Sequence, residues 1–311
     1  MCVAFWSLAH REYSLILCSN RDEFLSRPTL PAHFHSFDSE PGQRAEEPRI
    51  LSGRDLQAGG SWLGLNKAGK IALLTNITEA YGNYSSSRGH LVSSYLQSLP
   101  SCSLLNETKR IVGEDGRYAG FNLLLLAPKL QAERLTFDGS FVTNHGGGGE
   151  IVARSLSEEE KRCGGVSNGI DGSGASDWPK VRHGTEELDD LLNSNPSDFT
   201  DLDLSERLFE LLSSWKSQNP PKARAELRNT IQIEPLPMPT SGSANRAAPE
   251  FYGTRLSTVV LIRRNGDVLF IERDIWKVGA DGSPCKADPS TQRTFRFAIA
   301  SDAVIQHSLC N

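Results

Sequence analysis

Two apolar segments near the start of the chain predict a β-hairpin. Residues 2–8 and 13–18 are apolar and favourable for strands, and residues 9–12 between them are polar enough for a turn. If the turn centres near Arg11, residue 2 lies opposite residues 20–22 in an antiparallel pair. A cysteine, an asparagine, an arginine and an aspartate would then gather at one end of a buried sheet.

The same pattern predicts two further hairpins and several single strands. Residues 61–66 and 71–76 flank Lys67-Ala68-Gly69-Lys70, and this hairpin ends at Asn76. Residues 251–262 and 268–273 are joined by Asn265-Gly266, for which we expect a type I′ turn with two positive φ angles. The remaining predicted strands are 121–127, 135–142, 164–169 (ending in a polar tip) and 294–299.

Three segments carry apolar side chains at helical spacing. Residues 87–99 follow a serine run that can cap a helix, and Pro100 ends it. A second helix opens at Asp177-Trp178-Pro179, with Asp177 as N-cap, and runs to about Leu192. The third spans 204–216 and buries the face formed by Leu204, Leu208, Leu211, Leu212 and Trp215. Strands, then helices, then strands predict an α+β fold with two packed sheets covered by helices.

Two stretches lack periodicity. The residues from the first hairpin to about Arg49 predict a long surface loop, and 219–250, rich in proline, predicts an excursion or lid from a single domain spanning 1–311. The loop holds His33-x-His35, half of a metal site. No nearby carboxylate or cysteine cluster completes it, so we predict no metal centre.

Charge and cysteine usage exclude several classes of protein. The net charge of −5 argues against binding of nucleic acid or anionic lipid, because a negative protein does not attract these negatively charged partners. No apolar run approaches the roughly 20 residues that span a bilayer, and the N-terminus lacks a signal-peptide pattern. Six cysteines without a Cys-x-x-Cys pair indicate neither a zinc site nor a disulfide framework. We therefore expect a cytoplasmic protein.

Cys2 is the leading candidate for chemistry. Its small side chain permits removal of Met1, which would make Cys2 an N-terminal residue whose own α-amine could act as base. An ordinary α-amine titrates at about 7.7–8.0 and a thiol at about 8.5, so proton exchange between them is feasible near neutrality. The alternative is a small buried thiol at the start of a strand.

Motifs spread along the chain carry a resemblance to a known family. With its Asn-Arg-Asp-Glu tetrad at 20–23, the chain resembles the transport and Golgi organisation protein family, the group named for that tetrad. The matching blocks are Met1-Cys2, Arg27-Pro28, Gly59-Gly60-Ser61-Trp62-Leu63-Gly64, Leu74-Thr75-Asn76, Arg88-Gly89, Gly120-Phe121-Asn122-Leu123, Gly165-Val166-Ser167-Asn168 and Tyr252-Gly253-Thr254-Arg255.

The resemblance implies a fold and a set of site residues. The family is similar to N-terminal-nucleophile amidases of the choloylglycine hydrolase and penicillin V acylase kind, which have a four-layer αββα fold. By this likeness Cys2 is the nucleophile and Asp22 orients its α-amine. Asn76 and Asn168 support the oxyanion and the substrate amide, and Arg255 supplies a guanidinium. Ser19 departs from the pattern, because the bile-salt enzymes have Arg there. Further pocket candidates are Asn20, Arg21 and Trp62.

Structural roles compete with several of these assignments. Asp22 can instead pair with Arg21 or Arg255, and asparagines such as Asn76 and Asn168 often sit in turns. Arg255 lies in an apolar strand and needs a partner if that face is buried. The aromatic rings of Trp62 and Trp178 suit the core or a pocket wall.

Two functions follow. The family resemblance implies a role in Golgi organisation and protein secretion, association with the Golgi or mitochondria, and handling of a lipid, acyl-CoA or haem ligand, with no required cofactor. Haem needs an axial His, Cys, Met or Tyr, and no cysteine here precedes a proline as in haem-regulatory motifs. The alternative is a cysteine amidohydrolase that cleaves an amide or thioester with processed Cys2.

Overall fold

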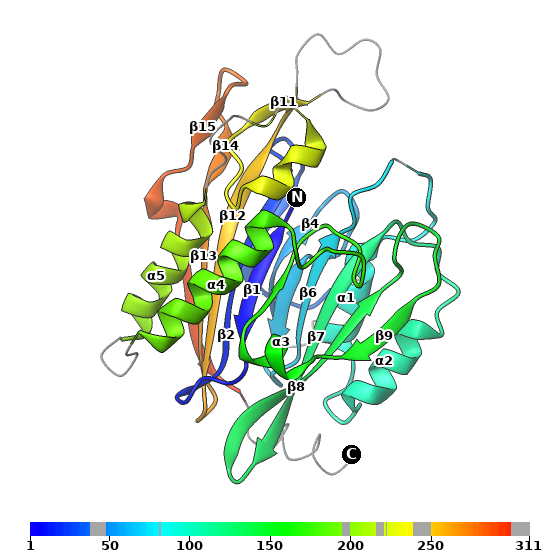
Figure 1. Cartoon of the computed structure of the whole chain (residues 1–311), viewed down its shortest axis with the longest axis vertical. Coiled ribbons are helices and arrows are strands. Elements are labelled where there is room, and N and C mark those ends of the chain that lie inside the picture. Colours follow the sequence, from blue (N-terminus) through cyan, green and yellow to red (C-terminus); the bar gives the residue numbers. More distant parts are fainter. Residues whose placement is uncertain are drawn as a thin grey trace.

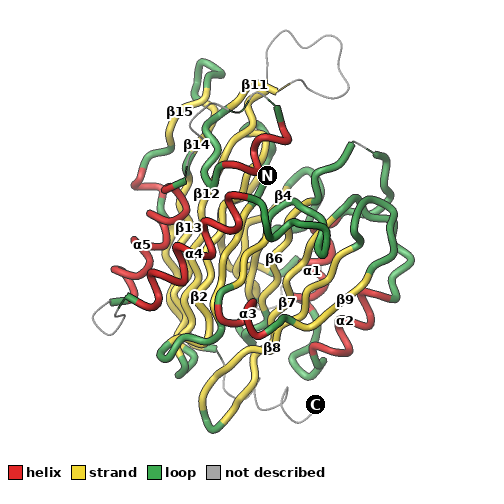
Figure 2. The backbone as a smooth tube through the Cα atoms, viewed as in Figure 1, coloured by secondary structure: helices red, strands yellow, loops and turns green. Residues whose placement is uncertain are grey.

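The protein is built from four layers. A computed structural model describes residues 1–37, 48–80, 82–194, 200–215, 221, 223–238 and 250–299. Two antiparallel sheets lie face to face, with α4 (Pro179–Asn193) and α5 (Asp201–Ser214) outside one sheet and α1 (Arg88–Gln97) and α2 (Leu104–Val112) outside the other (Figure 1). Figure 2 shows the same layers by type, with helices in red flanking the strands in yellow. The predicted α+β fold with αββα layers is confirmed.

The first sheet contains the N-terminal hairpin. Its strands follow the order β10-β1-β2-β12-β13-β16, and β11 pairs with β12. The strands are β1 (Val3–Ser7), β2 (Tyr13–Phe24), β10 (Gly164–Val166), β11 (Leu236–Met238), β12 (Glu250–Arg263), β13 (Asp267–Asp274) and β16 (Arg293–Ala298).

The second sheet follows the chain order from β3 to β9. Its strands are β3 (Thr29–His35), β4 (Ile50–Asp55), β5 (Leu63–Asn66), β6 (Ile71–Asn76), β7 (Phe121–Gln131), β8 (Arg134–Thr143) and β9 (Val152–Ser155). Short elements complete the structure: α3 (Glu158–Arg162), η2 (Arg224–Asn229), β14 (Trp276–Val278), β15 (Pro284–Lys286) and η3 (Pro289–Thr291).

Apolar side chains fill the spaces between the layers because alternate residues of a strand point to opposite faces. In β2, Leu15 and Leu17 face the second sheet, where they join Leu124 of β7. Ile16 of β2 points the other way and packs with Leu208 of α5. Both faces of these strands are buried, which explains their continuous apolar sequence.

The N-terminal hairpin has the predicted register. Val3 pairs with Asn20, so residue 2 lies opposite residue 21. The apolar run of the second strand ends at Cys18, whereas β2 continues to Phe24. The tetrad at 20–23 therefore lies within a strand, where its side chains alternate between the two faces.

The prediction of a surface loop before Arg49 is wrong for its described part. Thr29–His35 forms β3 and pairs with β4, a strand that was also missed. β3 lies at an edge of the sheet and contains Pro31, so it lacks a clear alternation. Residues 38–47 lie outside the described residues. His35 is buried with Nε2 2.8 Å from Ser52 Oγ, and no group of three metal-ligating side chains occurs in the described ranges.

The predicted helices are present with shifted ends, and α2 was missed. α5 begins at Asp201, where Thr200 and Asp203 form a capping box. The N-cap of α4 is Trp178, not Asp177, and Pro179 takes the first turn as predicted. Ser87 caps α1 without a side-chain hydrogen bond. Trp215, predicted on the buried face, is 37% exposed.

The turn at Asn265-Gly266 is not type I′. Only Gly266 has a positive φ, of 94°, and its amide donates to the carbonyl oxygen of Arg263. This is a three-residue connection in which a turn is followed by a left-handed glycine. Two consecutive positive φ angles occur instead at Ala132 and Glu133, between β7 and β8.

The proline-rich segment 219–250 is described only in part. Residues 223–238 form η2 and β11, and Leu227, Ile231 and Ile233 are fully buried. This half packs into the structure instead of standing away from it. The prediction for residues 239–249 lies outside the described residues.

No helix in the described part of the chain combines the length and apolar character needed to cross a membrane.

Candidate functional site

A cavity of 620 Å³ opens where β2 reaches its charged end. Cys2, Arg21 and Asp22 line it from the first sheet. The facing wall comes from the second sheet and from α1; its members include Trp62, Asn76, Tyr84 and Arg88. The end of the sandwich is therefore hollow and polar, while the interior beyond it is apolar.

The N-terminus is buried beside this cavity. The α-amine of Met1 lies 3.4 Å from Asp22 Oδ2 and hydrogen bonds to the Tyr252 hydroxyl. Tyr252 in turn donates to the carbonyl oxygen of Asp22 at 3.0 Å, and Thr254 donates to Asp22 Oδ1 at 2.6 Å. Burial lowers the pKa of the α-amine, although the nearby carboxylate opposes this shift. In the chain with Met1 present, Asp22 therefore pairs with the Met1 α-amine, and not with Arg21 or Arg255.

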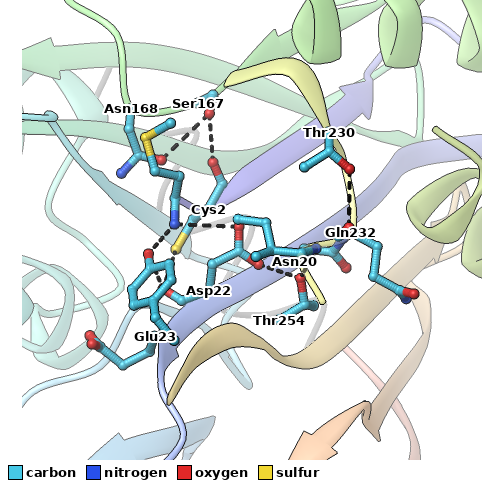
Figure 3. A network of polar contacts seen from close by, with 12 residues as sticks. Cys2, Asn20, Asp22, Glu23, Ser167, Asn168, Thr230, Gln232 and Thr254 are labelled. Carbon is cyan, nitrogen blue, oxygen red and sulfur yellow. Dashed lines mark hydrogen bonds and ion pairs between the residues drawn. The ribbon is translucent and has the colours of Figure 1, made fainter. Parts of the chain in front are cut away.

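The Cys2 thiol lies next to that network. Its Sγ is 3.7 Å from the carbonyl oxygen of Asp22, and Ser167 Oγ donates to the carbonyl oxygen of Cys2 at 2.7 Å (Figure 3). Burial raises the pKa of the thiol. A thiol in this state is protonated at neutral pH, so it needs a base to become a nucleophile.

Lys180, in the first turn of α4, reaches the same place from the helical layer. Its side chain is fully buried, and Nζ donates to the carbonyl oxygen of Met1 at 2.6 Å. Burial lowers the pKa of this ammonium, while Asp22 opposes the shift. Asp22 therefore forms an ion pair with the α-amine and acts on Lys180 only at longer range.

Arg21 is a buried cation on the cavity wall. Its guanidinium stacks on Trp62, with 3.9 Å between the guanidinium carbon and the ring centroid, and donates to Thr29 Oγ1 at 3.4 Å. Burial lowers its pKa. No carboxylate of the described residues lies within ion-pair distance of Arg21, although Glu23 and Asp55, which also line the cavity, oppose the effect of burial on its pKa. Trp62 is therefore a pocket-wall aromatic.

Arg255 and Asn20 lie near the cavity but serve the surrounding structure. Arg255 occupies a β-bulge in β12 and donates to the carbonyl oxygen of Arg27 and to Thr29 Oγ1. Burial, reinforced by Arg21, lowers its pKa to about 10. Asn20 points toward the helices, where Nδ2 donates to the carbonyl oxygens of Leu212 and Ile231 and Oδ1 accepts from Ser257.

The two predicted asparagines reach the site from different sheets. Asn76 ends β6 and lines the cavity with Cys2. Asn168 follows β10, is buried, and has Oδ1 3.4 Å from the Ser167 hydroxyl that binds Cys2. Cys2, Asp22 and Asn76 thus line one cavity, whereas Asn168 and Arg255 lie outside its lining, with Asn168 next to the Ser167 that binds Cys2.

A family model described as Transport and Golgi organisation 2 matches residues 1–277. The chain belongs to this family. A mouse Transport and Golgi organization 2 homolog is 30% identical over 284 residues, covering 88% of this chain and 93% of the relative. A bovine Transport and Golgi organization protein 2 homolog is 31% identical over 290 residues, covering 90% and 95%. Among solved structures, a mutant conjugated bile acid hydrolase from Clostridium perfringens is similar with a TM-score of 0.46, 10% identity and 96% coverage of both chains.

In this member of the Transport and Golgi organisation 2 family, the block around Gly60 and the block Arg88-Gly89 pack closely against each other. A side chain on Gly60 would place its Cβ 2.2 Å from the carbonyl carbon of Gly89, so position 60 needs glycine, whereas a Cβ on Gly89 would lie in a tight contact 3.1 Å from the carbonyl oxygen of Ser61. This contact fixes the start of α1, where Arg88 lines the cavity and donates to the carbonyl oxygen of Gly120 at 2.8 Å.

Sequence reasoning missed the roles of Lys180, Tyr252 and Arg88. Tyr252 and Arg88 lie in the blocks that carry the family resemblance, so the motif contained a signal for them. Lys180 follows a helix-opening Trp178-Pro179 and has the ordinary character of a helix surface residue. Its burial depends on the N-terminus, far away in sequence.

Proposed function

We propose that this protein is a cysteine hydrolase that cleaves an acyl amide or acyl thioester with processed Cys2 as nucleophile. The observation that carries the proposal is the buried α-amine held by Asp22 and Tyr252 directly beside the Cys2 thiol. Because burial lowers its pKa, such an amine is present in the neutral form that can accept the proton of the thiol.

The proposal requires removal of Met1, which would transfer the α-amine to Cys2. Asp22 Oδ2 has no hydrogen-bond partner among the described residues and only the α-amine as an ionic partner. A buried carboxylate that loses its cation is strongly destabilised. The new α-amine of Cys2, formed one residue along, would restore that neutralisation and lie on the same residue as the thiol.

The reaction proceeds through an acyl-enzyme. The Cys2 α-amine takes the thiol proton, and the thiolate attacks the substrate carbonyl carbon to give a tetrahedral oxyanion. The intermediate collapses, the bond to the amine or thiol leaving group breaks, and the leaving group takes the proton from the α-ammonium. Water, deprotonated by the same amine, then attacks the thioester, and the acid and free Cys2 thiol are released.

The surrounding residues have separate tasks in this scheme. Asn76 and Asn168 stabilise the oxyanion by donating side-chain N–H groups. Asp22 orients the α-amine. Arg255 is a positioning residue, because it holds the backbone at Arg27, whose side chain pairs with Asp55 on the cavity wall at 2.6 Å.

The ligand class and the cellular role are part of the proposal. Arg21 and Arg88 on the cavity wall make no direct ion pair among the described residues, so they are the groups that would bind the anionic part of an acyl substrate such as an acyl-CoA, which we favour over haem. The cavity offers haem Cys2 or Tyr84 as axial ligand types, and a thiol kept protonated by burial is a weak one. The family name supports a role in Golgi organisation and transport, and we further propose a role in protein secretion and action from the cytoplasm at the Golgi or mitochondria.

Two measurements test the proposal. Intact mass of protein from its native host should show that Met1 is absent. Wild type should then turn over a fluorogenic N-acyl amide or an acyl thioester and gain the acyl mass transiently. Cys2→Ala, whose small second residue also permits Met1 removal, should do neither while keeping the same circular dichroism spectrum. Retention of Met1 on essentially all molecules, or equal rates for both proteins, would refute it.

A further inference from the structure

The protein contacts Met1 at every group that this residue offers. The α-amine meets Asp22 and Tyr252, the carbonyl oxygen accepts from Lys180, and the thioether sulfur lies 2.8 Å from Thr78 Oγ1. Met1 is only 1% exposed. Such complete enclosure describes a shaped binding pocket that happens to be filled by the chain's own first residue.

The wall around the Met1 side chain is apolar. Leu227, Ile233 and Tyr252 are buried against it. Partly buried apolar residues complete the surroundings: Phe24, Trp178, Leu236 and Met238. η2 and β11 thus supply part of the wall, which gives the described half of the proline-rich segment a place in the site.

Lys180 is the polar end of this pocket. It is fully buried, and the Met1 carbonyl oxygen is the one hydrogen-bond acceptor for Nζ among the described residues. When Met1 leaves, the ammonium loses that acceptor, and Asp22 must already neutralise the new α-amine. A buried cation without an acceptor is costly, so an oxygen from water or from a ligand is needed there.

We propose that the pocket vacated by Met1 is a substrate subsite for an unbranched apolar chain bearing a carboxylate or carbonyl oxygen, and that Lys180 binds this oxygen. The inference rests on the proposed function, because the pocket is free only in the processed protein. Cys2 follows Met1 directly and also lines the polar cavity. The nucleophile would therefore lie between a small apolar subsite and a larger polar one that is lined by arginines and carboxylates.

Hexanoate is a suitable probe because its chain matches methionine from the carbonyl carbon to the terminal methyl. Binding should be measured by calorimetry on processed Cys2→Ala, in which turnover cannot interfere. We expect saturable binding of hexanoate and none of hexylamine, whose charge is reversed. Lys180→Met, a neutral side chain of similar length, should bind hexanoate at least about ten-fold more weakly.

Two further variants control for folding and for location. Cys2→Leu has a large second residue that prevents Met1 removal, so its pocket should stay filled and bind no hexanoate. Leu227→Phe should shorten the pocket and shift the preference from hexanoate to butyrate, which tests the site even if Lys180→Met fails to fold.

The outcomes separate this inference from the proposed function. No hexanoate binding, equal binding by Lys180→Met, or undiminished binding by Cys2→Leu would overturn the subsite even if Cys2-dependent hydrolysis is found. Lys180-dependent binding without any hydrolysis would instead keep the subsite and refute the enzyme.

Discussion

The two halves of β2 are equally buried but very different in chemistry. From Tyr13 to Cys18 both faces of the strand pack against apolar side chains, toward the second sheet and toward α5. From Ser19 to Asp22 the strand is still buried, yet every side chain is polar or charged. One strand thus serves as core at one end and as site at the other.

The polar half also divides into satisfied and unsatisfied groups. Asn20 has three partners in the fold, two carbonyl oxygens and a hydroxyl. Arg21 has one long hydrogen bond, to Thr29, and stacks on the ring of Trp62. Asp22 Oδ2 has no hydrogen-bond partner among the described residues and forms an ion pair with the α-amine of Met1. Buried groups with complete partners stabilise a fold, whereas incompletely partnered ones point to a ligand or a reaction. This contrast separates structural from functional residues within one tetrad.

Asp22→Asn should give the largest effect. The amide keeps the shape of the carboxylate but leaves the α-amine of Cys2 without its anion, so we expect a loss of about 10²–10³-fold in the rate of Cys2 acylation. Acylation can be followed by intact mass with an active ester. A rate within about three-fold of wild type would show that Asp22 does not orient the base.

Leu17→Ala should destabilise the apolar half by about 2–5 kcal/mol, because the side chain is fully buried between the sheets. Urea denaturation measures the free energy of unfolding. Leu105→Ala is the matched control, since Leu105 is 61% exposed and its loss should cost under about 0.5 kcal/mol. Similar values for both would contradict the assigned core.

Asn20→Ala should cost about 2 kcal/mol of unfolding free energy, because it strands the buried carbonyl oxygens of Leu212 and Ile231. The rate of acylation per folded molecule should stay within about three-fold of wild type. A stable variant with lost activity would move Asn20 from the structural group to the catalytic one.

The pH dependence of acylation should report the buried base. Burial lowers the pKa of the Met1 α-amine, and we expect the same direction for the Cys2 α-amine that would replace it beside Asp22, so that the neutral base persists below the ordinary range of about 7.7–8.0. The rate should therefore fall on the acid side only below that range, and not within it. A limb centred at the ordinary value would indicate an exposed amine or another base.

Arg21→Met should give the smallest change, at most about 1 kcal/mol and in the stabilising direction, because it removes a buried cation without a carboxylate partner. Arg27→Met is the contrasting control: it leaves Asp55 unpaired and should destabilise. Thermal unfolding of both variants measures the difference. Equal destabilisation would mean that Arg21 is neutralised within the fold.

The pattern of apolar residues predicted those parts of the fold that depend on residues close together in the sequence. Apolar alternation and the register of the first hairpin placed Cys2 beside Asp22, and the end of a second hairpin placed Asn76. β3 escaped prediction because it lies at the edge of its sheet. An edge strand has no neighbouring strand on one side, so its sequence need not alternate apolar with polar residues.

The remaining errors arise from events that alternation does not encode. A β-bulge between Thr254 and Leu256 takes Arg255 out of the simple alternation, so its place in the strand did not lead to the cavity. Lys180 looks like a solvated helix residue, and only the distant N-terminus explains its burial. Such positions depend on contacts between segments far apart in the sequence.

The enclosure of Met1 has a practical consequence for producing this protein. An affinity tag or fluorescent protein fused ahead of Met1 would turn the α-amine into an amide and push a peptide through a space that is sealed by Asp22, Tyr252 and Lys180. Such a fusion should displace β1 from its place in the first sheet or leave the N-terminal residues misfolded. Recombinant work should therefore leave the first residue unextended, or use a tag that a protease removes without leaving a residue behind.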